Sequence, residues 1–299
     1  MSSTATSPIR FRVDPVNPGQ FFACCGLLEL ADRLWSGAEA WFDHYGRAFC
    51  LRPYRPDKQP DYTPSAFARA IAECCLTNTM TESQIRRRDV LTSMPKKIRE
   101  SNTALETEKK ALDKLWREAP LILHEPFKLR LDWFLDERSG GSVFKTWAGQ
   151  QSVFEIARGL KAHIEAGTWN QLPSEQWLVK REQTEGLPFN FDSDLGGLGS
   201  DLDAGFSLDP LKSIHVQVRP FIEFAGFIGL QRFRPARINA ENRFRYHLWF
   251  DPLLPEVAAS AACGLTTPSK TRVFQFRLLY RTKYLKSFLP AIPFKRSQL

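Results

Sequence analysis

The sequence predicts an α+β fold, in which mixed helices are combined with antiparallel sheet and the C-terminal part is rich in strands. Apolar residues recur at helical spacing over 21–35, which indicates a buried helix. Apolar and polar residues alternate over 214–219, 243–250 and 272–281, as is typical of strands. With 299 residues, the chain is long enough for one large domain or two modest ones.

The first predicted helix follows a short strand and has a clear beginning. Residues 9–13 alternate between apolar and basic side chains, so we expect a strand there. Asn17 is a good N-cap and Pro18 fits the first helical position. At such a helix start, free N–H groups and the helix dipole can also meet a phosphate. Two interpretations stay open: a strand that leads into a core helix, and a helix that binds an anion beside Asn17 and Gln20.

The remaining elements are predicted from the same two periodicities. A proline-rich loop is expected over 53–64, and the polar, basic stretch 81–118 predicts a projecting helical arm. For that arm, two roles stay open: a solvated surface with ion pairs, and a basic arm that closes on a nucleic acid. Further strands are expected over 38–43, 46–52, 121–123 and 127–133, and further helices over 64–76, 99–118, 150–164 and 221–230.

Charge is distributed unevenly along the chain. We expect an N-terminal α+β region over 1–210, which includes the arm, and a β-rich basic region over 211–299, although one domain is also compatible. The net charge is +8, and residues 212–299 carry fifteen Lys and Arg against four Asp and Glu. A basic surface of this kind indicates an anionic partner.

The alternating strands predict where the positive charge lies. If these strands pair, one sheet face is an aromatic core and the other is basic. Like charges on neighbouring strands repel, and an anion relieves that repulsion; the alternative is a solvated sheet with scattered arginines. The candidate nucleic-acid-binding residues lie in these strands, in the arm and in the segment 231–239: Arg86, Arg87, Arg88, Lys96, Lys97, Arg219, Arg232, Arg234, Arg237, Arg243, Arg245, Arg277 and Arg281.

Residues 188–210 are rich in aspartate and glycine. Clustered carboxylates can hold Mg²⁺ or Ca²⁺, but Asp, Ser and Gly are also the usual residues of turns. The spacing is not that of an EF-hand, so we expect an ordered loop rather than a metal site. The aspartates concerned are Asp192, Asp194, Asp201, Asp203 and Asp209.

Several kinds of motif are missing from the sequence. It contains no Walker loop, no GxSxG, no HExxH and no CxxC, and its six cysteines are expected to be reduced core residues. We therefore expect no enzymatic activity, no metal and no cofactor. Neither a signal peptide nor an apolar run long enough for a membrane helix is visible, so a cytoplasmic protein without a membrane partner is expected.

Four stretches carry a resemblance to a known family: VNPGQFFACCGLLEL at 16–30, FKTWAGQQS at 144–152, the segment 191–207, which begins FDSD and ends DLDAGFS, and FIGLQRFRP at 227–235. Together they resemble the large-subunit family of the type I-G (formerly I-U) CRISPR Cascade complexes. The resemblance extends from about residue 9 to 290. The chain is short for such a subunit and shows no clear C-terminal helical bundle, which leaves open a separate small subunit.

The resemblance implies a non-catalytic subunit of a crRNA-guided surveillance complex in antiviral defence. Such a subunit reads the protospacer-adjacent motif, helps to open target double-stranded DNA and recruits the helicase-nuclease. The implied partners are the other Cascade subunits, crRNA, target DNA and the helicase-nuclease. On chemical grounds, amides at helix starts are candidates for reading base edges: Asn17, Gln20, Gln150 and Gln151.

Two other functions remain compatible with the sequence. One is a metal-dependent nuclease that uses the aspartates of 192–209. The other is a scaffold whose basic faces bind acidic proteins.

Overall fold

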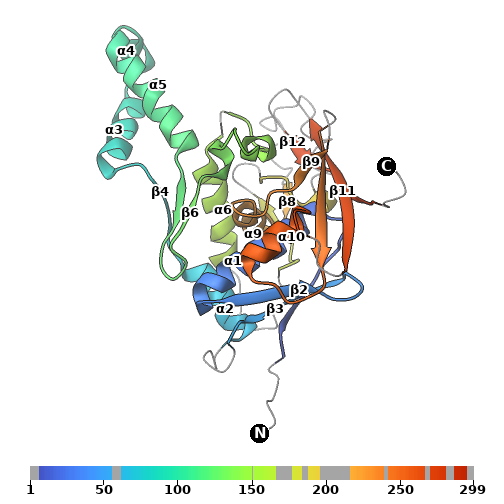
Figure 1. Cartoon of the computed structure of the whole chain (residues 1–299). Helices are drawn as coiled ribbons and strands as arrows, with labels where there is room; N and C mark the ends of the chain where they lie inside the picture. The colour runs from blue at the N-terminus through green and yellow to red at the C-terminus, as the bar shows by residue number, and fades with distance from the viewer. Residues whose placement is uncertain are drawn as a thin grey trace.

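The computed structural model confirms the α+β fold (Figure 1). Every strand pairing between the named strands is antiparallel. The structure describes residues 7–55, 62–149, 151–165, 177–183, 188–195, 216–238, 242–266, 270–280 and 286–294.

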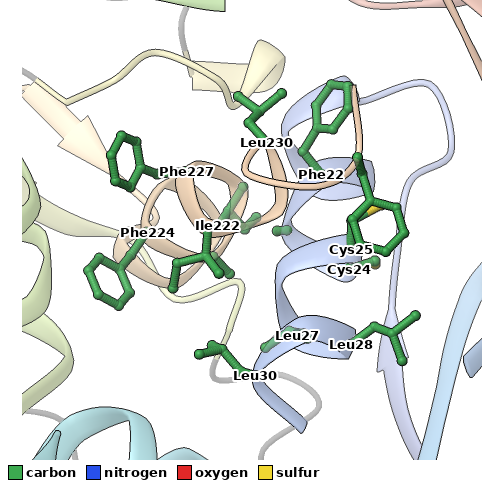
Figure 2. Close-up of a cluster of buried hydrophobic side chains, with 14 of the residues drawn as sticks. Phe22, Cys24, Cys25, Leu27, Leu28, Leu30, Ile222, Phe224, Phe227 and Leu230 are labelled. Carbon is green, nitrogen blue, oxygen red and sulfur yellow. The ribbon is translucent and has the colours of Figure 1, made fainter. Parts of the chain in front are cut away.

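Two helices that are distant in sequence form the centre of the molecule. These are α1 (Pro18–Trp35) and α9 (Pro220–Gly229), which lie side by side in Figure 2 with buried apolar side chains around them. Gly26 of α1 and Gly229 of α9 let the two backbones touch. A Cβ on Gly26 would lie 1.9 Å from the carbonyl oxygen of Ala225, and one on Gly229 would lie 2.1 Å from that of Phe22. Only glycine is compatible with this crossing.

Two antiparallel sheets pack around this helix pair. The predicted N-terminal strands form a sheet with the order β1-β3-β2, and the C-terminal strands form one with the order β12-β11-β10-β9, in which β13 also pairs with β11. Their bounds are β1 (Ile9–Arg12), β2 (Ala38–Phe42), β3 (Ala48–Pro53), β9 (Ala236–Ile238), β10 (Arg243–Trp249), β11 (Thr271–Tyr280), β12 (Lys286–Phe288) and β13 (Ile292–Pro293). A short helix that the periodicities did not predict, α10 (Pro255–Ala262), lies between β10 and β11 in the chain.

The predicted arm projects from the body of the molecule (Figure 1). It comprises three helices, inserted between two strands of a small β4-β5-β6 sheet. A capping box at Thr81 begins the first of them and Asn102 caps the last. The elements here are α2 (Pro64–Glu73), β4 (Leu76–Asn78), α3 (Glu82–Ser93), α4 (Lys96–Glu100), α5 (Thr103–Glu118), β5 (Leu121–Leu123) and β6 (Leu129–Leu131).

The elements after the arm complete the core. Two 3₁₀ turns, η2 (Trp133–Leu135) and η3 (Gly141–Phe144), precede α6 (Val153–Glu165), and α6 packs against α9. A two-stranded sheet pairs β7 (Arg181–Gln183) with β8 (Val216–Val218). One hydrophobic cluster contains residues from both sides of the predicted boundary at 210/211, so that boundary does not separate two cores within the described residues.

The structure corrects two details of the sequence prediction. The alternation over 214–219 predicts a strand of the basic sheet, but β8 pairs with β7, and Pro220 then begins α9. The six cysteines form no disulfide, and Cys24, Cys25, Cys50 and Cys74 are buried as expected. Cys75, however, is exposed and Cys263 is half-buried.

The crossing of α1 and α9 makes a testable prediction. Gly→Ala normally favours a helix by up to about 1 kcal/mol. In Gly26→Ala, however, the new methyl group meets backbone rather than a flexible side chain, so we expect a loss of about 2–3 kcal/mol in unfolding free energy. Urea denaturation measures it. The control is Gly149→Ala, whose new Cβ would have no neighbour within 4 Å. Equal stability of the two variants would contradict the close crossing.

Candidate nucleic-acid interface

The predicted division of the C-terminal sheet into an aromatic face and a basic face is confirmed for β10 and β11. Phe244, Tyr246, Phe274 and Phe276 are buried against the core. The alternate residues face outward, with Arg243 directly opposite Arg277 and Arg245 directly opposite Gln275. We call these four outward residues, together with Phe294, the basic sheet face.

The basic sheet face places like charges next to each other. Arg243 and Arg277 are directly opposite, an arrangement that costs up to about 1 kcal/mol. Within the described part of the chain, no carboxylate lies within 4.0 Å of the Arg245 or Arg277 guanidinium. Arg245 instead lies 3.6 Å from the centre of the Phe294 ring, in a cation–π contact. The face therefore offers positive charge and an aromatic surface at one place.

Arg219 does not belong to this face. It is the residue before α9, and its side chain turns inward to Asp192 at 3.0 Å and Asp194 at 2.9 Å. Burial alone would lower the pKa of Arg219, but the two carboxylates raise it overall. The expectation that three strands gather their arginines on one side is therefore wrong for this strand, because its arginine holds a buried carboxylate inside the protein.

The arginines of the segment 231–239 are separated from one another. Arg232 pairs with Glu29 of α1 at 2.6 Å and with Glu256 of α10 at 2.9 Å. Arg234 pairs with Asp136 at 2.6 Å. The strand register places Arg237 on the opposite face of the sheet from Arg243 and Arg245. Arg237 donates a hydrogen bond to Asn242. These ion pairs tie helices and loops together, so the first two side chains are used within the fold. Arg281 lies outside the described residues.

Ion pairs also cover much of the charge on the arm. Arg86 pairs with Glu82, and Arg87 donates to both carboxylate oxygens of Glu108. Arg88 pairs with Asp113 and lies over the Trp116 ring, Lys96 pairs with Glu100, and Lys97 is exposed. This arrangement favours the solvated arm with ion pairs over the arm that closes on a nucleic acid.

The start of α1 is sealed rather than open. Asn17 caps the helix as predicted, but it is fully buried and its amide donates to Asp192 at 2.7 Å. A Cβ on Gly19 would lie 2.4 Å from the carbonyl oxygen of Phe191, so the segment 188–195 lies directly on the first turn. An anion at the helix N–H groups is therefore excluded, and Asn17 is not available to read bases.

The two other candidate amide side chains that the structure describes, those of Gln20 and Gln151, have hydrogen-bond partners within the protein. The Oε1 atom of Gln20 accepts from the Asp14 N–H at 2.8 Å, and that of Gln151 accepts from the Ala148 N–H at 2.9 Å. Gln150 lies outside the described residues.

A buried acidic network lies beneath the start of α1. Glu223 accepts hydrogen bonds from the backbone N–H groups of Phe191 and Asp192 at 3.3 and 2.9 Å. Burial raises the pKa of Glu223 to about 8 and also raises the pKa of Asp192, although Arg219 and Asn17 act to lower the latter. The described residues contain no group of three or more His, Cys, Asp or Glu arranged to hold a metal ion. Asp201, Asp203 and Asp209 lie outside them.

Comparisons with known proteins do not identify the chain. No family model matches it, and no curated protein or solved structure shows a significant similarity to it. Among the described residues, no helix is both long and apolar enough to cross a membrane.

The ion pair between Arg232 and Glu29 predicts a stability effect. Glu29 is buried at 2% exposure, and when Arg232 is replaced it keeps Arg33 as its one cationic partner among the described residues. We expect Arg232→Gln to lower the unfolding free energy by about 1–3 kcal/mol. Arg86→Gln, at an exposed i,i+4 pair, should leave it unchanged within error. An Arg232→Gln protein with the same unfolding free energy as wild type would argue against a structural role for this arginine.

The raised pKa of Glu223 predicts a pH dependence. Because the folded state holds this proton up to about pH 8 and the unfolded state releases it near pH 4.5, stability falls as the pH rises between these values. Glu223→Gln stays neutral, so wild type should lose unfolding free energy relative to the variant, by a few kcal/mol at most, between pH 5 and 8. Chemical denaturation at several pH values measures this, with the exposed Glu125→Gln as control. Parallel curves for wild type and Glu223→Gln would contradict it.

Proposed function

We propose that this chain is the non-catalytic large subunit of a type I-G Cascade complex and that its basic sheet face contacts nucleic acid. In that complex it would contribute to recognition of the protospacer-adjacent motif, to crRNA-guided binding of target DNA and to recruitment of the helicase-nuclease. The single observation that carries nucleic-acid binding is the pair of opposed arginines, Arg243 and Arg277, beside the Arg245–Phe294 stack.

The chemistry of this face fits a nucleic-acid strand better than an acidic protein surface. Arginines bind phosphates in a bidentate manner, and they do so whatever the base sequence. An aromatic ring next to them supplies a surface on which a base can stack. Ile292, 63% exposed on the neighbouring β13, extends the apolar part of this surface. An acidic protein would need only the charges and would gain little from the ring.

The family resemblance also supports the proposal, but the residues that carry it lie mainly in the core rather than on the basic sheet face. Three of its four stretches meet where α1, α9 and the segment 188–195 pack together, at Gly19, Gly26 and Gly229. The resemblance therefore bears on how the chain folds, whereas the basic sheet face is a separate observation on its surface.

The proposal predicts a salt dependence that can be assigned to the face. Fluorescence anisotropy should show binding of single-stranded RNA and duplex DNA that weakens linearly on a log–log plot against salt. For single-stranded RNA, Arg243→Gln/Arg277→Gln should reduce the slope by about 1.4, because each lost phosphate contact removes about 0.7. Lys128→Gln/Arg130→Gln removes two exposed charges near β6 and should leave the slope unchanged.

Two results would count against the proposal. If both double variants reduce the slope equally, the positive charge acts only as a general attraction and the face is not the site. If the tagged chain, purified from cells, carries no repeat-derived RNA and no Cascade subunits, the assignment to that complex fails. If the purified chain carries acidic proteins but no nucleic acid, the result would support the function as a scaffold instead.

A further inference from the structure

A cavity opens beside the sealed start of α1, on a different part of the molecule from the basic sheet face. Its volume is about 620 Å³, within the range of roughly 300–1,000 Å³ usual for small-molecule sites. Three arginines from three separate parts of the chain line it. Arg12 ends β1, Arg47 precedes β3 and Arg219 precedes α9.

The charged side chains that line this cavity differ in their partners. Asp194 lines it but is held by Arg219, and Asp14 lines it with one carboxylate oxygen accepting from the Val16 N–H at 3.1 Å. Arg12 and Arg47 are exposed, and no carboxylate of the described chain lies within 4.0 Å of either guanidinium. The cavity therefore presents two cationic side chains that form no ion pair with any carboxylate among the described residues.

The backbone that carries these two arginines is fixed in place. The Val13 N–H donates to the carbonyl oxygen of Arg47 at 2.9 Å, which holds the two segments side by side. The Trp177 indole N–H donates to the carbonyl oxygen of Arg12 at 3.0 Å. Tyr246 donates to the carbonyl oxygen of Pro15 at 2.6 Å. The backbone of such a site loses little conformational entropy when a ligand binds.

The remaining lining is suited to a larger ligand than a bare anion. Val13, Pro15 and Leu178 contribute apolar surface, and Gln20 contributes an amide that its hydrogen bond to Asp14 orients. A phosphate ion alone would occupy a small part of this volume and would leave the apolar surface uncovered.

We propose that this cavity binds a nucleoside 5′-phosphate, either as a free nucleotide or as the 5′-terminal nucleotide of a strand. Arg12 and Arg47 bind the phosphate. Arg219 lines the same cavity, but its charge is taken up by Asp192 and Asp194. The sugar and base lie against Leu178 and Pro15. This site shares no residue with the basic sheet face, so the inference goes beyond the proposed function and does not depend on it.

The test compares phosphorylated with unphosphorylated ligands on the full chain. Binding of a 5′-phosphorylated tetranucleotide, the same tetranucleotide with a 5′-hydroxyl group, AMP and inorganic phosphate is measured by calorimetry. We expect the 5′-phosphorylated tetranucleotide or AMP to bind at least tenfold more tightly than the hydroxyl form. Comparable binding of AMP and the phosphorylated strand indicates a free nucleotide, whereas tighter binding of the strand indicates a strand end. Both results support the site.

Arg12→Gln/Arg47→Gln locates the site, because both side chains are exposed and their loss should not disturb folding. This variant should lose tenfold or more in affinity for the phosphorylated ligand, with an unchanged circular dichroism spectrum. Lys128→Gln/Arg130→Gln, which removes the same charge from exposed positions near β6, should retain the affinity for the phosphorylated ligand. Equal affinities for the phosphorylated and hydroxyl forms, inorganic phosphate binding as tightly as AMP, or an unaffected Arg12→Gln/Arg47→Gln protein would each overturn the proposal.

Discussion

The backbone contact between α1 and α9 is the constraint on which the rest of the fold depends. Because Gly26 and Gly229 let the helices approach so closely, residues about 200 positions apart in the chain share one core. Asn17 and Asp192 then close the helix start, and Arg219 and Glu223, at the beginning of α9, face the same buried network. The central crossing thus determines which polar groups are enclosed and which arginines remain at the surface.

Within the described residues, many of the basic side chains have a structural use. Arg232, together with Arg33, holds the buried Glu29, and Arg219 holds the buried Asp192. The net charge of +8 is therefore no measure of how many arginines cluster on the surface. On the basic sheet face, Arg243 lies opposite Arg277 and Arg245 lies over the Phe294 ring, and in the cavity beside α1 the exposed Arg12 and Arg47 lie on neighbouring segments.

The pattern of apolar and polar residues along the chain predicted many of the helices and strands. Contacts between residues distant in sequence determine where the candidate site lies. Asn17 and Pro18 gave the start of α1, and alternation gave β10 and β11 with their buried aromatic face. The pairing of β8 with β7 was not predictable, because three alternating residues carry no information about their partner strand. The partners of Arg219 and Arg232 come from 27 and 203 residues away, so no local pattern could reveal them. Arg12 and Arg47 were missed as site residues because only the fold brings them to one cavity.

The most direct measurement of the central claim is ultraviolet cross-linking of a bound, photoactivatable strand, followed by mass spectrometry of the linked peptides. The account predicts that the linked peptides come from β10, β11 and the residues around Phe294, where base stacking and phosphate contact coincide. Cross-links confined to the arm, or spread evenly over the surface, would contradict the claim that the outer face of this sheet binds nucleic acid.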